Sequence, residues 1–376
     1  MSWRTCMLGD VLTLKRGHDL PEGARVPGDV PVVSSSGITG RHNTAIADPP
    51  GVVTGRYGTI GEVFFLDEPY WPLNTSLYVI DFKGNDPKFS SYLLRNTLRN
   101  YRSEKAAVPG VNRNVLHTLG VSVPDLQTQH KIVSALRAYD DLIQNNRRRI
   151  ALLEEAARLL YREWFVHFRF PGHEHAKFVD GLPEGWQRVP ASQAFDINPK
   201  TPKRDEPTIR YVPMAALSET GMLIDRTAIE VRESASGARF QNGDTLLARI
   251  TPCLENGKTG FVQMLAEAEV ACGSTEFIVL RGALVSNYFV YLVSRQEDFR
   301  ENAIHSMIGS SGRQRVQASC FDRYMIAVPS ENLAALFDES VQSMFEQIGN
   351  LDQQNQKLAQ ARDLLLRRLL SGELAL

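Results

Sequence analysis

The feature that most constrains the fold of this chain is an apolar heptad pattern that occurs twice. The first copy follows Val123-Pro124, and the second follows Val328-Pro329, 205 residues later. In each copy the apolar positions are alternately four and three residues apart, which is typical of a helix that buries one face against a partner helix. A pattern repeated at a constant offset predicts a duplicated module.

The buried face of each predicted helix can be listed residue by residue. In the first helix it comprises Ile132, Leu136, Tyr139, Ile143, Asn146, Ile150, Leu153, Ala157, Leu160 and Trp164. In the second helix it comprises Phe337, Val341, Met344, Ile348, Leu351, Asn355, Leu358, Arg362, Leu365 and Leu369. A helix of this length with one apolar face needs a partner, and the chain contains one.

Antiparallel packing of the two helices within the chain would fix their register. It sets three pairs opposite each other: Asn146 with Asn355, Trp164 with Phe337, and Tyr139 with Arg362. The guanidinium of Arg362 can then stack on the ring of Tyr139. A polar Asn pair inside an apolar seam costs stability but specifies register. A coiled coil between two chains explains the heptads equally well.

Each predicted helix follows a segment rich in short strands and turns, which predicts an α+β fold. Thr245–Arg249 and Gly257–Gly260 repeat the pattern of Val52–Arg56 and Tyr57–Gly61. The predicted architecture is two similar domains, joined and separated by two long helices that form an antiparallel coiled coil with pseudo-two-fold symmetry. The predicted boundaries are 1–125 for the first domain, 126–170 for the first helix, 171–185 for a linker, 186–329 for the second domain and 330–376 for the second helix.

Composition places the chain among ordinary globular proteins, with 376 residues, 43% hydrophobic and 23% charged. The N-terminus lacks the apolar run of a signal peptide, and no apolar stretch is long enough to cross a bilayer. The four cysteines have no C-x-x-C spacing, which favours reduced thiols. We therefore expect a cytoplasmic protein without a membrane segment.

Three short motifs suggest chemistry, but none has the required neighbours. Asn256-Gly257-Lys258-Thr259 resembles a phosphate-binding loop, but Pro252 occupies the position of its first glycine. Asp48-Pro-Pro-Gly51 has Gly where an aminomethyltransferase has an aromatic residue. His173-Glu174-His175 lacks the H-E-x-x-H spacing of a zinc site. We predict a chain without catalytic residues, a bound metal or a cofactor of its own.

The order of domain, helix, domain and helix resembles the specificity (S) subunits of Type I restriction–modification systems. Local matches support this resemblance: Ser35-Ser-Gly37-Ile-Thr-Gly40 before Val53–Gly58, Leu160–Trp164 in the first helix, and Leu369-Leu-Ser-Gly-Glu373 in the second. The resemblance covers essentially the whole chain. It implies that each domain is a target-recognition domain reading one half of a split double-stranded DNA target.

The resemblance also implies partners. The helices would set the separation of the half-sites and dock two methyltransferase (modification) subunits, and restriction/translocase subunits would complete the complex. S-adenosylmethionine, ATP and Mg are expected in those partners, through which the complex methylates adenine and cleaves DNA. The net charge of −1 is low for a DNA-binding protein. A subunit inside a larger complex can, however, take affinity from its partners.

Base readers are expected among polar and basic side chains on loops at one edge of each domain. In the first domain we select Ser36, Arg41, His42, Arg56, Tyr57, Asn74, Asn112 and Arg113. In the second we select Arg249, Thr251, Lys258, Ser274, Arg313, Gln314 and Arg315. The loops 110–114 and 311–315 stand out because each contains an Arg close to a Gly. The competing interpretation of each residue is a solvated side chain or a local turn.

Two other functions remain open at this stage. One is a fused DNA methyltransferase, which binding of S-adenosylmethionine by the isolated chain would reveal. The other is a coiled-coil scaffold with two protein-binding heads, which would not retain DNA even with its partners present.

Overall fold

The computed structural model describes residues 3–56, 61–99, 101, 110–202, 207–234, 236–310 and 312–374. The chain divides into two compact units, one comprising residues 1–143 with 356–376 and the other residues 144–355. Each unit therefore contains one globular domain and one part of each long helix. Tyr57, one of the predicted DNA-binding residues, lies outside the described residues.

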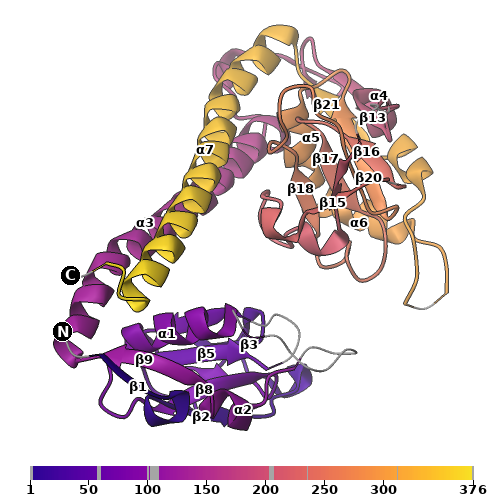
Figure 1. Ribbon diagram of the computed structural model, residues 1–376. Helices are drawn as coiled ribbons and strands as arrows, with labels where there is room; N and C mark the ends of the chain where they lie inside the picture. Colours follow the sequence, from indigo (N-terminus) through magenta and orange to yellow (C-terminus); the bar gives the residue numbers. More distant parts are fainter. Residues whose placement is uncertain are drawn as a thin grey trace. The chain divides into compact units, whose positions relative to one another are not determined.

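The domain of the first unit is built on three small sheets (Figure 1). The central sheet is antiparallel, in the order β2 (Thr13–Arg16), β8 (Ser76–Asp81), β5 (Gly51–Gly55) and β6 (Val63–Leu66). The second sheet contains β4 (Gly37–His42), β3 (Val30–Ser34) and β7 (Trp71–Pro72), with β3 and β7 parallel. The third pairs β1 (Trp3–Met7) with β9 (Gly120–Pro124).

Helical segments complete this domain and join it to the long helices. They are η1 (Leu8–Asp10), η2 (Glu22–Ala24), α1 (Pro87–Arg99) and α2 (Arg113–His117). Phe89 and Leu93 of α1 belong to the same buried cluster as Leu136 of α3 and Leu366 of α7. The domain and the helix segments of the first unit thus share one hydrophobic core, because the amphipathic faces of all three helices are buried together.

The domain of the second unit repeats this arrangement, which confirms the α+β class with two similar domains. Its central antiparallel sheet has the order β13 (Phe195–Ile197), β20 (Phe277–Gly282), β17 (Thr245–Ala248) and β18 (Thr259–Phe261). Its second sheet has the order β15 (Glu230–Arg232), β14 (Ile209–Val212), β19 (Ala271–Gly273) and β16 (Ala238–Phe240). Strands β14 and β19 are parallel, like β3 and β7. β12 (Gln187–Pro190) pairs with β21 (Met325–Val328), like β1 with β9.

The remaining elements of the second unit are short. They are η4 (His173–His175), β10 (Phe178–Val179), β11 (Leu182–Pro183), α4 (Ala191–Ala194), η5 (Met214–Ala216), η6 (Arg226–Ala228), α5 (Asn287–Ser294), α6 (Glu297–His305) and η7 (Ala318–Asp322). Ser286 caps α5 by accepting a hydrogen bond from Phe289 N at 3.2 Å. The chain leaves the helical conformation at Gln296, between α5 and α6.

The two long helices are α3 (Leu126–Tyr161), extended by the π-helical turn η3 (Arg162–Val166), and α7 (Glu331–Leu370). Asp125 precedes α3, and its Oδ1 accepts a hydrogen bond from Thr128 N at 2.9 Å, as an N-cap does. No helix in the described part of the chain is both long enough and apolar enough to cross a membrane.

Within each unit the segments of α3 and α7 run side by side and antiparallel (Figure 1). In the second unit the rings of Trp164 and Phe337 lie 5.6 Å apart, so this expected contact is present. In the first unit Arg362 Nη1 donates to Asp140 Oδ1 at 2.7 Å. On the opposite helix, Arg362 therefore pairs with the residue that follows Tyr139, and its stacking on Tyr139 stays a prediction.

The Asn pair lies in the second unit. Asn146 is 1% exposed, and its Nδ2 has no hydrogen-bond partner. The buried Oδ1 of Asn355 also has no hydrogen-bond partner. Asn146 lies as many residues before Trp164 on α3 as Asn355 lies after Phe337 on α7. A free donor on one helix and a free acceptor on the other are complementary, so their direct pairing remains a prediction.

Candidate nucleic-acid interface

Backbone hydrogen bonds join three loops of the first domain at Arg56, which follows β5. Arg56 N donates to Thr75 O at 2.9 Å, and Val111 N donates to Arg56 O at 2.8 Å. The loop before β8 and the loop before α2 therefore meet at the end of β5. This junction brings together three of the predicted contact residues, Arg56, Asn74 and Asn112, although they are far apart in the sequence.

The second domain contains the same junction at Arg249, which follows β17. Arg249 N donates to Glu276 O at 3.0 Å, and Val316 N donates to Arg249 O at 2.8 Å. A further bond runs from Thr251 N to Gln314 O at 3.1 Å. We call this set of backbone bonds the loop junction of each domain. It collects most of the residues selected in the second domain: Arg249, Thr251, Ser274, Gln314 and Arg315.

Several selected side chains are exposed on the loops. Arg113 is the first residue of α2, and Asn112 caps that helix by accepting from Asn114 N at 2.9 Å. Arg313 lies in the equivalent loop of the second domain and is exposed. Ser36 and Arg41 are also exposed, in the turn between β3 and β4 and at the end of β4. Arg41 donates to the backbone oxygen of Asp29.

Other selected residues are engaged by the fold. His42 is 7% exposed, its Nδ1 accepts from Val26 N at 3.0 Å, and its ring meets Trp71 edge-on. Asn74 donates to Asp19, and Lys258 Nζ donates to Met214 O at 3.3 Å. Ser274 Oγ accepts from Glu276 N at 3.1 Å. Because His42 is buried and hydrogen-bonded, the structure assigns it to the core and not to a DNA-facing surface.

Arg315 is held by a carboxylate beside the loop junction. Its Nη2 and Nε donate to Glu276 at 2.6 and 2.9 Å, and these hydrogen bonds hold the pKa of the Glu276 carboxyl below its usual range. The pair is partly exposed, so its contribution to stability is small. Its effect is geometric, because a bidentate pair orients both side chains.

A pocket of about 430 Å³ opens beside the loop junction of the second domain. Arg249 and Arg239 line it together with Asn198, Thr275 and the buried ring of Phe277. The Nε of Arg249 is buried and has no hydrogen-bond partner. Two guanidinium groups and an amide in one concavity are suited to a phosphate or a base edge.

Sequence patterning missed Arg239, Asn198 and Thr275 as lining residues. A usable signal was Gly237, which precedes the short strand β16. Gly237 has a φ of 137°, and a Cβ there would lie 1.9 Å from Gly273 O. Only glycine lets the backbone approach that closely, so a glycine with an arginine two residues later marks this wall of the pocket.

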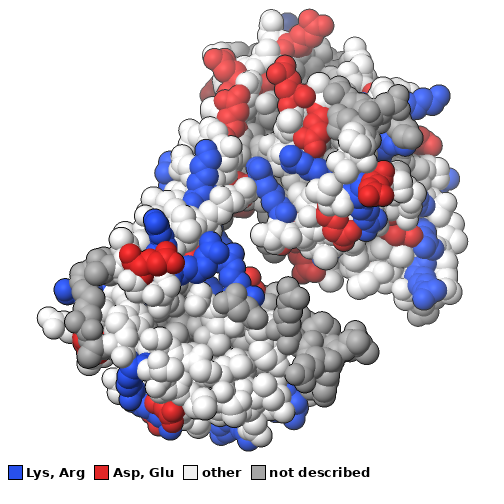
Figure 2. Space-filling view, in the orientation of Figure 1, with Lys and Arg blue, Asp and Glu red and all other residues white. Residues whose placement is uncertain are grey.

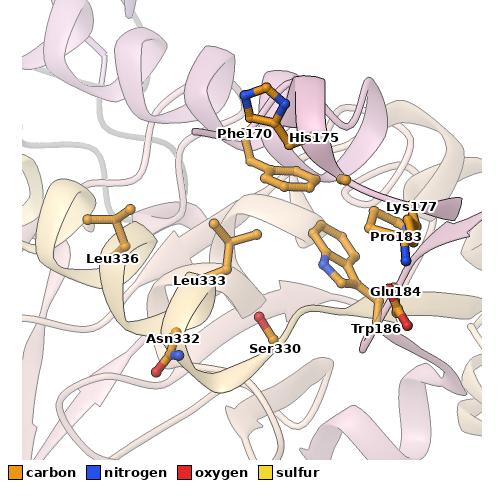
Figure 3. A pocket seen from close by; sticks show the side chains of 11 residues that line it. Phe170, His175, Lys177, Pro183, Glu184, Trp186, Ser330, Asn332, Leu333 and Leu336 are labelled. Carbon is orange, nitrogen blue, oxygen red and sulfur yellow. The ribbon is translucent and has the colours of Figure 1, made fainter. Parts of the chain in front are cut away.

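A second pocket of about 430 Å³ lies at the start of α7 in the same unit. Figure 3 shows Phe170, Trp186 and Leu333 around it, and the rings of Phe170 and Trp186 lie 5.4 Å apart. No residue selected for DNA contact lines this pocket. Figure 2 shows both basic and acidic side chains on the visible face of each unit.

Comparison with known proteins shows which family the chain resembles. Residues 2–155 match the Type I restriction modification DNA specificity domain. The HindI specificity subunit of Haemophilus influenzae is 23% identical over 389 residues, covering 84% of each chain. The EcoEI specificity subunit of Escherichia coli is 30% identical over 195 residues, which are 50% of this chain and 33% of that relative. The chain is therefore similar to Type I restriction–modification specificity subunits, and the family match covers residues 2–155.

A solved structure agrees on the fold. The S subunit from M. genitalium superimposes with a TM-score of 0.51 and 14% identity, covering 98% of this chain and 96% of that one. The family match ends within α3, so it spans the first domain and most of the first helix. The repeated sheets and the repeated loop junction extend the same organisation to the second domain.

Proposed function

We propose that this chain is a Type I specificity subunit and reads a bipartite DNA target, with one half-site bound by each domain. The observation that carries the proposal is the loop junction, which occurs in both domains and gathers polar and basic residues from three loops. A reader of base edges needs such side chains on an edge that can enter a groove. Arg113 and Arg313 are the exposed basic residues of equivalent loops, and they are our primary candidates for base contact.

The proposed function requires no catalytic residues in this chain. Two methyltransferase subunits would dock on the long helices, and restriction/translocase subunits would join through them. S-adenosylmethionine, ATP and Mg would be bound by those partners. Because the proposed target is cellular DNA, the proposed place of action is the cytoplasm.

Apolar side chains on the long helices support the docking of partners. Helices α3 and α7 expose large apolar residues outside their shared seam: Leu142, Leu152, Leu159, Leu336 and Leu364. Leu152 and Leu159 are seven residues apart and so lie on one face of α3. A row of exposed leucines on a helix fits an amphipathic partner helix.

The test is methylation mapping in a host that expresses this chain with its modification subunit. We expect methylated adenines in a motif of two short halves with a fixed gap. Replacing residues 1–125 by those of a relative should change one half only. A change in both halves would contradict the modular assignment, and a complex that retains no DNA would favour the scaffold interpretation.

A further inference from the structure

A buried carboxylate anchors the second domain to α3. Glu154 is 5% exposed, and three groups donate to it. Tyr291 OH of α5 donates to Oε1 at 2.5 Å, and Met222 N donates to Oε2 at 2.9 Å. Arg158, one turn further along α3, donates to Oε1 as well. Both oxygens of Glu154 are therefore used, and two of the three donors belong to the domain.

Two arginines extend this anchor across the domain surface. Arg158 Nη2 donates to Thr220 O at 2.7 Å. Arg295 Nε donates to Tyr291 OH at 3.0 Å, and its Nη1 donates to Gly257 O at 2.8 Å. The hydroxyl of Tyr291 thus accepts one bond and donates another. The network links α3, α5 and two loops of the domain.

The first unit has an equivalent anchor. Tyr92 OH of α1 donates to Asp140 Oδ2 of α3 at 2.6 Å, and Tyr92 is almost fully buried. Arg362 Nη1 of α7 donates to Asp140 Oδ1 at 2.7 Å, and Lys88 Nζ lies 3.5 Å from Oδ2. Asp140 therefore receives donors from the domain and from the second helix.

The two tyrosines occupy the same place in the repeat. Helices α1 and α5 each follow the last strand of their central sheet, β8 and β20. Each tyrosine precedes two apolar residues, and an arginine follows three or four positions after the tyrosine, in Tyr92-Leu-Leu-Arg95 and in Tyr291-Leu-Val-Ser-Arg295. Both carboxylates come from α3. The same polar contact therefore recurs in both units, within interfaces that are otherwise largely apolar.

Apolar packing alone would let a domain shift on its helix at small cost, because hydrophobic contact is not directional. A charge-assisted hydrogen bond to a buried carboxylate is directional and is expensive to leave unmade. We propose that the Tyr92–Asp140 and Tyr291–Glu154 anchors are positioning devices that fix the orientation of each recognition domain on the helices and thereby fix the gap between the half-sites. This inference rests on the proposed function.

The test uses the full chain assembled with its modification subunit. The variants are Tyr92→Phe and Tyr291→Phe, which keep the ring and remove only the hydroxyl. The matched control is Tyr324→Phe, because Tyr324 OH donates at 2.8 Å to Asp298 of its own domain and not to a long helix. Methylation is mapped on a plasmid library that carries both half-sites with gaps one base pair shorter, native and one base pair longer.

We expect the half-site bases to stay the same in all variants. In Tyr92→Phe and Tyr291→Phe, the preference for the native gap over the neighbouring gaps should fall about ten-fold, as loss of one such hydrogen bond predicts. Tyr324→Phe should keep the wild-type gap preference even if its melting temperature falls. If both anchor variants melt earlier but keep the native gap preference, the anchors are merely stabilising and the inference is wrong. If the wild-type complex methylates no split motif, the proposed function itself fails.

Discussion

Arg249 and Arg315 lie on adjacent segments of the second domain, and the Nη2 of Arg249 donates to Val316 O at 3.3 Å. Arg315 is paired in bidentate fashion with Glu276, whereas Arg249 has a buried Nε without a partner and lines a pocket with Arg239. An unpaired buried donor has a free-energy cost that a ligand can relieve. This makes the pocket residues stronger candidates for DNA contact than Arg315.

We predict that Arg239→Ala and Arg249→Ala each relax one half of the methylation motif. The native base at the affected position should lose about ten-fold of its preference, as removal of one good base contact implies. Methylation mapping of the complex measures this. Arg232→Ala is the control, because Arg232 is paired with Glu230 and stacks on Tyr211. Equal relaxation of both halves would contradict a contact made by one domain.

The ionisation of Asp140 gives a prediction on pH. Burial raises the pKa of Asp140, but hydrogen bonds from Tyr92 and Arg362 and the charge of Arg362 outweigh burial and hold the pKa below the ordinary 3.8. A carboxyl whose pKa is depressed by folding stabilises the protein above its unfolded pKa and loses that contribution as pH falls through its native pKa.

Asp140→Asn should therefore lower the melting temperature near neutral pH. The difference from wild type should shrink as the pH falls below about 4. Thermal unfolding over that pH range measures it. Asp141→Asn is the matched control, since Asp141 is exposed and its ion pair with Arg137 is loose at 3.5 Å. A difference that stays constant down to the lowest pH would exclude the ionised Asp140 as its source.

At the scale of the element, the heptad period predicted both long helices, and the structure begins α3 at Leu126, as the sequence indicated. The contact of Trp164 with Phe337 follows from the same register. The π-helical turn at Arg162–Val166 was not predictable, because it changes the hydrogen-bond spacing and leaves the composition of a helix unchanged.

The partner of Arg362 was also difficult to predict. A seam drawn from the heptad considers only residues on that face, so it offered the ring of Tyr139. Asp140 lies at the edge of the seam, and a charge-assisted hydrogen bond to a carboxylate is stronger than a cation–π contact. His42 was selected because the local sequence indicated a polar residue on a loop. Its burial depends on the pairing of β3 with β4, which the local sequence does not show.

The Asn residues of the seam make an element-scale prediction. Asn146→Leu combined with Asn355→Leu should raise the free energy of unfolding by about 1 to 3 kcal/mol, because it removes a buried donor and a buried acceptor that lack partners. Either single variant should gain less, since the remaining Asn keeps its unpaired group. Chemical denaturation of the three variants measures this. A double variant that is less stable than wild type would contradict a stability cost of the two Asn residues in the seam.

At the scale of the whole molecule, the duplication was visible in the helices because their seams keep one offset. In the domains the offset increases along the chain, from Arg56 and Arg249, through Thr75 and Glu276, to Val111 and Val316. Insertions of different length therefore separate the two copies. Residues that meet only at the loop junction, such as Arg56 and Asn112, could be selected as polar loop residues, but their proximity required the structure.

The length of the helices makes the whole-molecule prediction. Seven residues inserted in both α3 and α7, between 143 and 144 and between 355 and 356, keep the seam in phase and add about 10 Å of helix. The gap should then lengthen by about three base pairs, at 3.4 Å each, with the half-site bases unchanged. Methylation mapping measures the gap. Insertion of four residues is the control, because it breaks the seam and should abolish methylation. New half-site bases after the seven-residue insertion would contradict the spacer role.

The loop junction has a consequence for how such a protein diversifies. Its bonds join backbone amides to backbone carbonyls, so they do not depend on which side chains the loops carry. Side-chain mutations in those loops can therefore accumulate without breaking the backbone hydrogen bonds of the loop junction. Substitutions in the loops can therefore change the recognised target bases at little cost in folding stability, while the rest of the molecule stays the same.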